Sequence, residues 1–132
     1  MAAKSFDEVM ARFREINIPP EFDTVVAIAN GGIVPAGIIN QRLGAELRIL
    51  YINLRDINQK PLYDLPKLLS PVDFSYEGKR ILLVDDRIKS GATITFAKNL
   101  LKGAAAIKTF AVNGNADYAL YNEECFRFPW II

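Results

Sequence analysis

The sequence contains no histidine and only one cysteine, Cys125. Without those side chains the chain cannot build a disulfide framework, a Cys-His zinc site, a histidine general base or a Cys-His nucleophile pair. Any chemistry must therefore come from carboxylates, lysine, arginine, hydroxyl groups and backbone amides.

An excess of one charge is also missing, because 16 Lys and Arg side chains are balanced by 15 Asp and Glu side chains, for a formal net charge of +1. Such a balance creates no overall field that would attract nucleic acid or an anionic membrane, and we expect neither as a partner. The sequence also lacks an apolar run long enough to span a bilayer and the pattern of a secretory signal, which predicts a cytoplasmic protein.

The remaining composition is that of an ordinary globular chain. Of its 132 residues, 51% are hydrophobic and 23% are charged. That length supports one core but leaves little room for a second unit of ordinary size, so we expect a single domain over residues 1–132.

Segments with helical spacing alternate with short apolar segments that are typical of buried strands. A capping box of Ser5 and Glu8 predicts the start of a helix that Pro19 closes. We expect further helices at residues 33–43, with Gly44 as the C-cap, and at 93–102, and strands at 24–29, 47–54, 80–84 and 107–112. This alternation predicts an α/β fold, a single doubly wound domain with a mainly parallel sheet.

Two polar loops follow predicted strands, at the carboxyl ends where sheets of this kind bind ligands. One is Asn30-Gly31-Gly32, and the other runs from Asp85 to Thr93 and opens a helix. Backbone amides and the helix dipole at such a start favour an anion, and a phosphate monoester would fit. The candidate phosphate-binding residues are Lys89, Ser90, Gly91, Ala92 and Thr93.

Asp85 and Asp86 precede this loop and would repel the same phosphate, so they need a different partner. Ribose hydroxyls or a hydrated Mg²⁺ would supply one. The plain alternative is a solvated turn between a strand and a helix, with Ser90 or Thr93 as the helix N-cap.

The segment from Ile81 to Thr93 resembles the phosphoribosyl-diphosphate binding motif of the type I phosphoribosyltransferases: four apolar residues, two acids, a connector, then Ser or Thr, Gly, any residue and Thr. The resemblance implies that Asp85 and Asp86 hold the ribose hydroxyls close to Mg²⁺ and that residues 89–93 wrap the 5-phosphate. It also implies that Asp85, Asp86 and Lys89 act in catalysis.

The stretch from Ala29 to Ala36 is similar to the diphosphate-binding loop of that family, which acts through its backbone and often contains a strained or cis peptide. The likeness assigns diphosphate binding to Asn30, Gly31 and Gly32, with Asn30 in place of a usual Arg or Lys. Taken alone, the same residues are compatible with a plain glycine turn.

The order of segments from residue 24 to 130 is similar to the bacterial and archaeal xanthine, guanine and hypoxanthine phosphoribosyltransferases, down to a Pro-Trp pair in the tail. It implies the type I fold with a reduced C-terminal hood. Besides Asn30, four positions depart from the pattern: Arg87 for an aliphatic residue, Lys89 for an Asp, Val112 for a Lys and Cys125 for a Trp. The last three lie on the base side. Phe126, Phe128 and Trp130 would either stack on a base or cover the sheet or a dimer contact.

The resemblance therefore implies a Mg²⁺-dependent transferase that moves the ribose 5-phosphate of phosphoribosyl diphosphate to a nucleobase, with purine-type salvage favoured, and that forms a homodimer. The alternative is a non-catalytic module that binds phosphoribosyl diphosphate or a nucleotide. The resemblance also implies a mobile flap, to which Arg55, Asp56, Lys60 and Tyr63 correspond loosely. The alternative is that these residues form a solvated surface loop.

Overall fold

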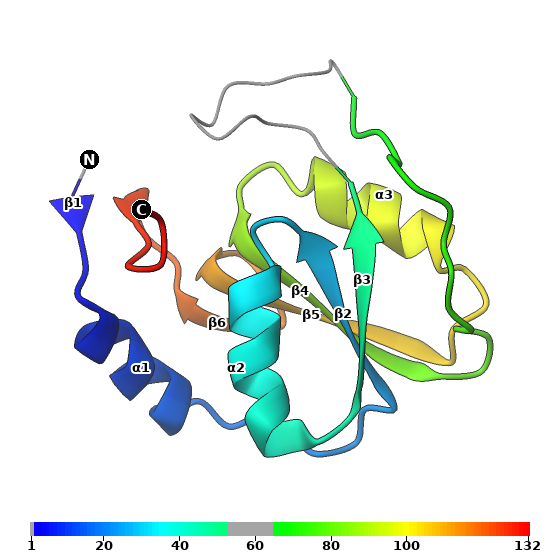
Figure 1. Cartoon of the computed structure of the whole chain (residues 1–132), viewed down its shortest axis with the longest axis horizontal. Coiled ribbons are helices and arrows are strands. Elements are labelled where there is room, and N and C mark those ends of the chain that lie inside the picture. Colours follow the sequence, from blue (N-terminus) through cyan, green and yellow to red (C-terminus); the bar gives the residue numbers. More distant parts are fainter. Residues whose placement is uncertain (1, 53–64) are drawn as a thin grey trace.

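The computed structural model describes residues 2–52 and 65–132, and the expected flap residues Arg55, Asp56, Lys60 and Tyr63 lie outside these ranges. Its centre is a five-stranded sheet in the order β3-β2-β4-β5-β6 (Figure 1). The strands are β2 (Thr24–Ala29), β3 (Glu46–Tyr51), β4 (Arg80–Ile88), β5 (Ala106–Gly114) and β6 (Tyr118–Tyr121). Every pairing in this sheet is parallel, which confirms the predicted α/β fold.

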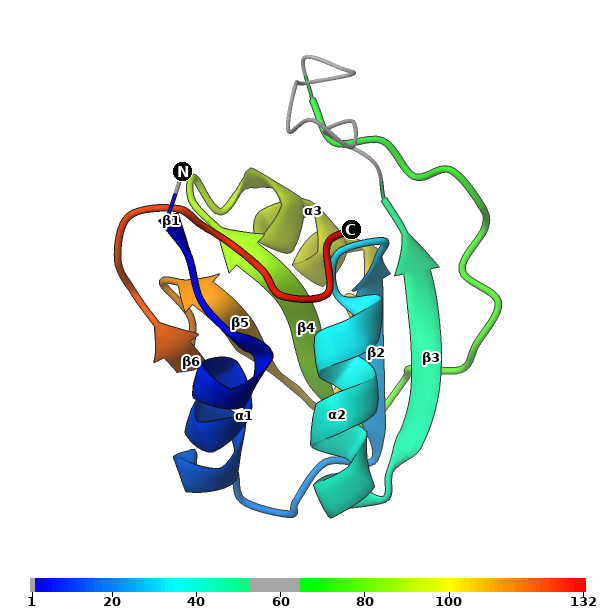
Figure 2. The ribbon, with the colours of Figure 1, turned by 60° about the vertical axis from the view of Figure 1, so that its left-hand side comes forward.

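Helices cover both faces of the sheet. Figure 2 shows α1 (Phe6–Glu15) and α2 (Ile33–Leu43) in front of the strands, whereas α3 (Ala92–Leu100) packs in the core on the other face. In β2, Val25 and Ala27 belong to the core under α1 and α2, and the alternate residues belong to the core under α3. A strand covered on both faces must be apolar on both, which explains why all six residues of β2 are buried.

Local sequence sets the start of α1 and the end of α2 as predicted, whereas α1 ends at Glu15, before the predicted stop at Pro19. The Ser5 hydroxyl accepts a hydrogen bond from the Glu8 amide at 3.1 Å, and the Glu8 carboxylate accepts one from the Ser5 amide at 3.2 Å. Helix α2 ends at the C-cap Gly44, whose φ is 60°. Both caps satisfy backbone groups that have no partner within the helix.

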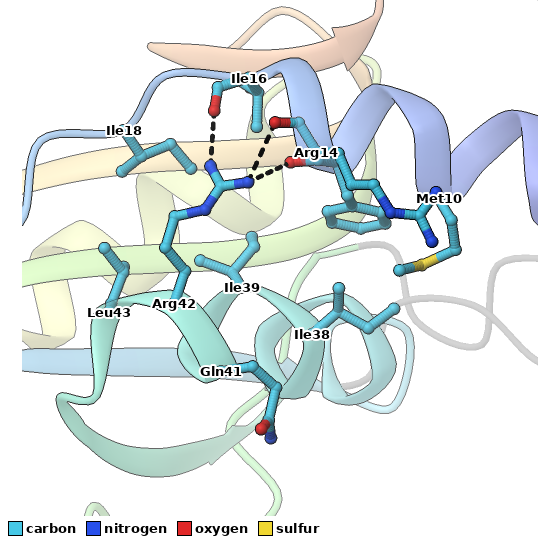
Figure 3. Close-up of a pocket in the computed structure, with 10 residues that line it drawn as sticks. Met10, Arg14, Ile16, Ile18, Ile38, Ile39, Gln41, Arg42 and Leu43 are labelled. Carbon is cyan, nitrogen blue, oxygen red and sulfur yellow. Dashed lines mark hydrogen bonds between the residues drawn. The ribbon is translucent and has the colours of Figure 1, made fainter.

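The two helices on the front face are joined at their ends by Arg42 (Figure 3). Its guanidinium donates to the carbonyl oxygens of Phe13 at 2.8 Å and Arg14 at 3.2 Å in the last turn of α1, and to that of the C-cap Ile16 at 2.6 Å. A cation at this end complements the helix dipole. The apolar pocket beside Arg42 is lined by residues of α1, of the segment that follows it and of the carboxyl-terminal half of α2, at the opposite end of α2 from the Asn30-Gly31-Gly32 loop.

Strand β4 is longer than predicted. The apolar run predicts a strand that ends at Val84, but the ladder with β5 continues to the pairs Arg87–Asn113 and Ile88–Gly114. The acidic pair therefore lies within a strand and not in the loop that follows it. Adjacent aspartates are poor strand formers, and here pairing with β5 overrides that local preference. Helix α3 begins at Ala92, one residue before the predicted start, and ends at Leu100, two residues before the predicted end.

Three short strands were not predicted: β6 and the pair of β1 (Ala2–Ala3) with β7 (Phe126–Arg127). Strand β6 runs parallel to β5 after a connection of only residues 115–117, whereas parallel neighbours ordinarily need a dozen or more. Asp117 holds this return in place: its carboxylate accepts from the Thr109 amide at 2.9 Å and from the Thr109 hydroxyl at 3.0 Å. Within residues 2–52 and 65–132, no helix is long and apolar enough to cross a membrane.

Replacing Asp117 with alanine removes the carboxylate oxygen that accepts from both the amide and the hydroxyl of Thr109. We expect Asp117→Ala to lower the free energy of unfolding by about 1–2 kcal/mol, the usual contribution of hydrogen bonds to a charged, partly exposed group. Urea unfolding monitored by circular dichroism measures this, with the exposed neighbour Asn115→Ala as the control. Equal stability of the two variants would contradict the role given to Asp117.

Candidate functional site

The two polar loops found in the sequence meet in the structure at the carboxyl ends of β2 and β4, which are neighbours in the sheet. A methyl group placed on Gly31 would lie 2.5 Å from the carboxyl atoms of Asp86. The acidic pair and the Asn30-Gly31-Gly32 loop are therefore in direct contact. This contact brings together the predicted ribose side and the predicted diphosphate side.

The Asn30-Gly31-Gly32 loop is closed by its own backbone. The Gly32 amide donates to the Ile28 carbonyl at 2.7 Å, and the Ile33 amide donates to the Asn30 carbonyl at 3.1 Å. The Ala29–Asn30 peptide bond is cis. A Cβ on Gly32 would overlap the Val84 carbonyl oxygen and lie 2.8 Å from the Ile28 carbonyl oxygen, so this position has room only for glycine. The Gly32 amide is thus already paired inside the loop.

The two carboxylates differ in their surroundings. The Asp86 amide donates to the Asp85 carboxylate at 2.8 Å, which fixes the first side chain against the backbone of the second. Burial, together with the negative charge of Asp86, raises the pKa of Asp85 well above its ordinary value of 3.8. The ionised pair is therefore costly by itself, and a cation or hydroxyl donors placed next to it would be stabilising.

A metal ion at this point would need oxygen ligands from outside the protein. No group of three or more His, Cys, Asp or Glu side chains able to hold a metal occurs in the part of the chain that the structure describes. Asp85 and Asp86 offer two neighbouring carboxylates. Mg²⁺ is commonly held in this way, by one or two carboxylates with waters and substrate phosphates. The carboxylates of Asp85 and Asp86 therefore fit Mg²⁺ when waters or substrate oxygens supply its other ligands.

The predicted phosphate loop connects β4 to α3 through residues 89–91. Gly91 is the N-cap of α3, with a φ of 82°, so neither Ser90 nor Thr93 caps the helix as the plain alternative assumed. The Ser90 hydroxyl accepts from the Ala92 amide at 3.3 Å. The exposed side chains of Lys89 and Ser90 and the first amides of α3 thus surround one end of the helix.

Arg87, noted in the sequence only as a departure, contacts the C-terminal tail. Its guanidinium donates to the Phe126 carbonyl at 2.9 Å and lies 4.8 Å from the centre of the Phe128 ring. Phe128 stacks in turn on Trp130, with ring centres 5.4 Å apart and an angle of 8° between the planes. The aromatic tail was expected either to stack on a base or to cover the sheet or a dimer contact. Phe126 and Phe128 cover the sheet, because both are buried in the core under α1 and α2.

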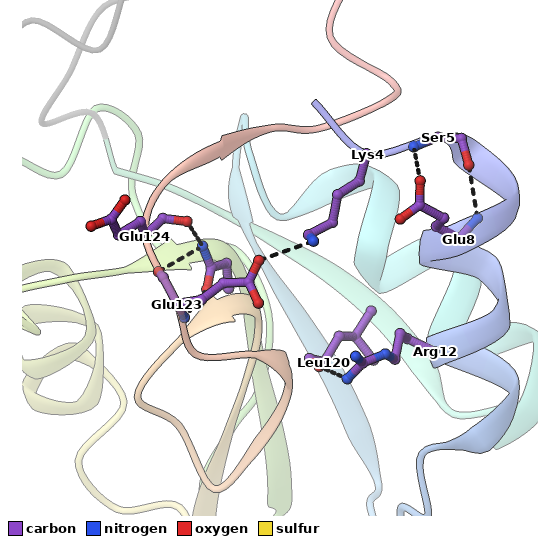
Figure 4. A network of polar contacts seen from close by, with 8 residues as sticks. Lys4, Ser5, Glu8, Arg12, Leu120, Glu123 and Glu124 are labelled. Carbon is purple, nitrogen blue, oxygen red and sulfur yellow. Dashed lines mark hydrogen bonds and ion pairs between the residues drawn. The ribbon is translucent and has the colours of Figure 1, made fainter. Parts of the chain in front are cut away.

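The loop before this tail is held by Asn113 and by the N-terminal segment (Figure 4). The Asn113 side chain donates to the carbonyls of Glu123 at 3.2 Å and Glu124 at 3.3 Å, and it accepts from the Glu123 amide at 3.0 Å. The Lys4 ammonium lies 3.0 Å from the Glu123 carboxylate. It also lies 4.7 Å from the centre of the Tyr121 ring. Sequence reasoning missed these contacts because they join segments distant in the chain.

Cys125 faces the end of β4. Interaction with the Lys89 ammonium lowers the pKa of the Cys125 thiol, and the charge of Arg87 acts in the same direction. The tail therefore places Cys125 next to Lys89, the first residue of the predicted phosphate loop. Val112, the remaining departure, is fully buried in the core under α1 and α2 and lines no part of this surface.

Comparison with known proteins gives one consistent result. Residues 3–126 match the family described as Phosphoribosyl transferase domain. A xanthine-guanine phosphoribosyltransferase of Gluconobacter oxydans is 30% identical over 112 residues, covering 84% of this chain and 67% of that protein. An orotate phosphoribosyltransferase of Pyrobaculum islandicum is 27% identical over 104 residues, covering 79% of this chain and 50% of that protein.

Solved structures show the same fold. A purine phosphoribosyltransferase from Pyrococcus horikoshii superposes with a TM-score of 0.80 at 21% identity, covering 98% of this chain and 92% of that one. A Neisseria gonorrhoeae protein with bound ppGpp superposes with a TM-score of 0.71 at 18% identity, covering 98% and 88%. The fold implied by the motif resemblance is confirmed.

Two glycine substitutions should separate the shape of the site from the stability of the fold. In Gly31→Ala the new methyl group meets the end of the Asp86 side chain, which can move; we expect a stability loss of about 1 kcal/mol or less but weakened binding of ribose 5-phosphate. In Gly32→Ala it meets backbone, and we expect a loss of about 3 kcal/mol or more. Urea unfolding and titration calorimetry measure both effects.

Gly37→Ala is the matched control, because a Cβ there meets nothing within 4 Å. Equal stability of the Gly31→Ala and Gly32→Ala variants would show that the loop does not pack as described.

The raised pKa of Asp85 predicts a pH-dependent stability. The folded state holds the Asp85 proton to higher pH than the unfolded state, so stability falls as pH rises from about 3.8, and the full cost is present above the folded pKa. We expect Asp85→Asn to be more stable than the wild type at neutral pH by about 1 kcal/mol or more, because each pKa unit corresponds to about 1.4 kcal/mol.

Thermal unfolding of both proteins over a pH series measures the difference, which should disappear below the ordinary pKa of 3.8. Asp73→Asn, at an exposed carboxylate, is the control. A stability gain that is the same at every pH would rule out the buried charge as its cause.

Proposed function

Because this chain belongs to the phosphoribosyltransferase family, which its residues 3–126 match, we propose that it transfers the ribose 5-phosphate of phosphoribosyl diphosphate to a nucleobase. Diphosphate is the other product. The observation that carries this proposal is the contact between Gly31 and Asp86 beside the N-terminus of α3. It gathers at one edge of the sheet the groups that a diphosphate, a ribose and a 5-phosphate each require.

Each part of the substrate has a matching set of donors or acceptors. The 5-phosphate takes the first amides of α3, the hydroxyls of Ser90 and Thr93 and the charge of Lys89. The ribose hydroxyls donate to Asp85 and Asp86, whose mutual repulsion they relieve. The diphosphate lies against the Asn30-Gly31-Gly32 loop. Since the Gly32 amide is paired with Ile28, the Asn30 and Gly31 amides are the donors assigned to it.

Catalysis in this proposal is electrostatic. Bond breaking at ribose C1 leaves positive charge on the sugar and negative charge on the departing diphosphate. Asp85 and Asp86 stabilise the first, while the Asn30 and Gly31 amides stabilise the second. Mg²⁺, held by the two carboxylates together with substrate oxygens, would supply further neutralisation of the diphosphate.

The acceptor favoured by the relatives is a purine. The Gluconobacter oxydans relative is named for xanthine and guanine, and the Pyrococcus horikoshii structure is that of a purine phosphoribosyltransferase. The non-catalytic alternative, a module that binds phosphoribosyl diphosphate or a nucleotide on the same fold, predicts binding of those ligands without diphosphate release.

Diphosphate release from phosphoribosyl diphosphate and Mg²⁺, measured with a panel of purines and pyrimidines, tests the proposal. We expect release with at least one base. Asp86→Asn should lower kcat/KM by about 100-fold, the order found when one electrostatic contact to a transition state is lost. The Tm of that variant should change little, because the Asp86 carboxylate faces the loop and not the core.

Asp73→Asn, at an exposed carboxylate away from the loop, should keep wild-type activity. Tight binding of phosphoribosyl diphosphate without release for any base would favour the non-catalytic module. Unchanged binding in Asp86→Asn would show that the site lies elsewhere.

A further inference from the structure

Two neighbouring strands hold the C-terminal tail at the edge of the sheet where the site lies. Arg87 of β4 and Asn113 of β5 are directly paired in the ladder between these strands. The Arg87 guanidinium donates to the Phe126 carbonyl at 2.9 Å, and the Asn113 side chain bonds the backbone of Glu123 and Glu124. The tail is thus fixed at two points by residues that are partners in the sheet.

Arg87 directly follows the acidic pair. The Asp86 carboxylate meets the Gly31 backbone, and the next residue along β4 reaches the tail. Strand β4 lies between β2 and β5 in the sheet. The Asn30-Gly31-Gly32 loop follows β2 on one side of β4, and residues 123–126 are held from β4 itself and from β5 on the other side.

If the ribose and the diphosphate lie as proposed above, on which this inference rests, the base approaches from the side of the tail. In a displacement at ribose C1, the bond to the incoming nitrogen forms on the face of the sugar opposite to the departing oxygen. The diphosphate is assigned to the loop after β2. The base therefore comes from the direction of β5, where the tail is held.

Stability alone does not account for an arginine at position 87. The side chain is half-buried, and its Nε is one of the buried polar atoms that have no hydrogen-bond partner in residues 2–52 and 65–132. A buried donor without an acceptor is destabilising, and an apolar side chain would bury no such donor. The contribution of Arg87 is therefore to position what it touches.

The contacts of Arg87 extend to the end of the tail. Its guanidinium lies 4.8 Å from the centre of the Phe128 ring, which stacks on Trp130 with 8° between the planes. A planar guanidinium can stack on a ring and donate a hydrogen bond at the same time, so it fixes both the backbone of Phe126 and the ring of Phe128.

We propose that Arg87 is a positioning residue, which holds the tail as the wall against which the base is placed. The ribose 5-phosphate does not depend on this wall, because Asp85, Asp86 and the first amides of α3 are assigned to it. Loss of Arg87 lowers the affinity for the base part of a ligand and leaves the affinity for the ribose phosphate part unchanged.

GMP and ribose 5-phosphate provide the probe pair, because GMP consists of ribose 5-phosphate joined to a purine. The ratio of their dissociation constants isolates the base part and requires no turnover. Titration calorimetry measures both constants. The sequence has a single tryptophan, Trp130, and its fluorescence reports the position of the stack.

We expect the wild type to bind GMP more tightly than ribose 5-phosphate. Arg87→Met keeps the apolar part of the side chain. It should weaken GMP binding about tenfold, the effect of one lost hydrogen bond from a charged donor, and change ribose 5-phosphate binding by less than about twofold. The emission of Trp130 should move to longer wavelength as the stack loosens.

Arg87→Lys keeps the charge, which guards against a variant that fails to fold. It should lower the ratio as well, because an ammonium group has no plane that can stack on Phe128 while it donates to the Phe126 carbonyl.

Arg12→Met is the matched control. The Arg12 guanidinium makes the same two kinds of contact away from the site: it donates to the Leu120 carbonyl at 3.1 Å, shown in Figure 4, and lies 4.5 Å from the centre of the Tyr121 ring. Asp117→Ala is the control for lowered stability. Both controls should keep the wild-type ratio, and an equal loss in either would overturn the proposal.

An unchanged ratio in the two Arg87 variants, an equal loss of affinity for both ligands, or equal binding of both ligands by the wild type would each overturn the proposal. The diphosphate-release assay decides the proposed function separately. A ratio that falls without release for any base would overturn the transferase and leave the positioning role standing. Release with an unchanged ratio would do the reverse.

Discussion

Strands β2 and β4 approach each other so closely at their carboxyl ends that side chains are excluded between them. A Cβ on Gly32 would overlap the backbone of both strands, and a Cβ on Gly31 would meet the Asp86 carboxylate. That approach follows from the parallel pairing of two strands buried on both faces. It places the backbone of the Asn30-Gly31-Gly32 loop against the carboxylate of Asp86 in β4, and the rest of the candidate site is arranged around this contact.

The acidic pair illustrates how such a site differs from a stable core. Burial and mutual repulsion make Asp85 costly to ionise, yet the extended β4 holds both side chains at the edge where β2 ends. The cost is met by the pairing of β4 with β5 on one side and β2 on the other. Ligand oxygens or a cation would recover part of it, which is the sense in which the fold is prepared for binding.

The central elements were predictable from sequence because their signals are local. The apolar run of β2, the Ser5–Glu8 capping box and the Gly44 C-cap each depend on residues within one or two turns. The position of the two loops followed from the rule that parallel strands carry ligands at their carboxyl ends. Family resemblance in the same loops agreed with the match over residues 3–126.

The missed features depend on partners that are distant in the chain. Local propensity could not show that β5 would extend β4 through the acids, or that Asp117 would allow a parallel return of so few residues. The contact of Arg87 with Phe128 is of the same kind. The sequence did hold a signal for this contact, because an arginine within an apolar strand requires a partner. The spacing of residues could not show that the partner lies in the tail.

The pairing of β1 with β7 ties residues 2–3 to residues 126–127 of the tail. These two-residue strands form a sheet of their own, apart from the five strands that carry Asp86 and Gly31. Their ladder closes a loop that contains nearly the whole chain, which is entropically expensive for so few hydrogen bonds. Fraying of that ladder would release residues 2–3 and 126–127 from each other and leave intact the parallel pairing of β2 with β4, which brings Gly31 against Asp86.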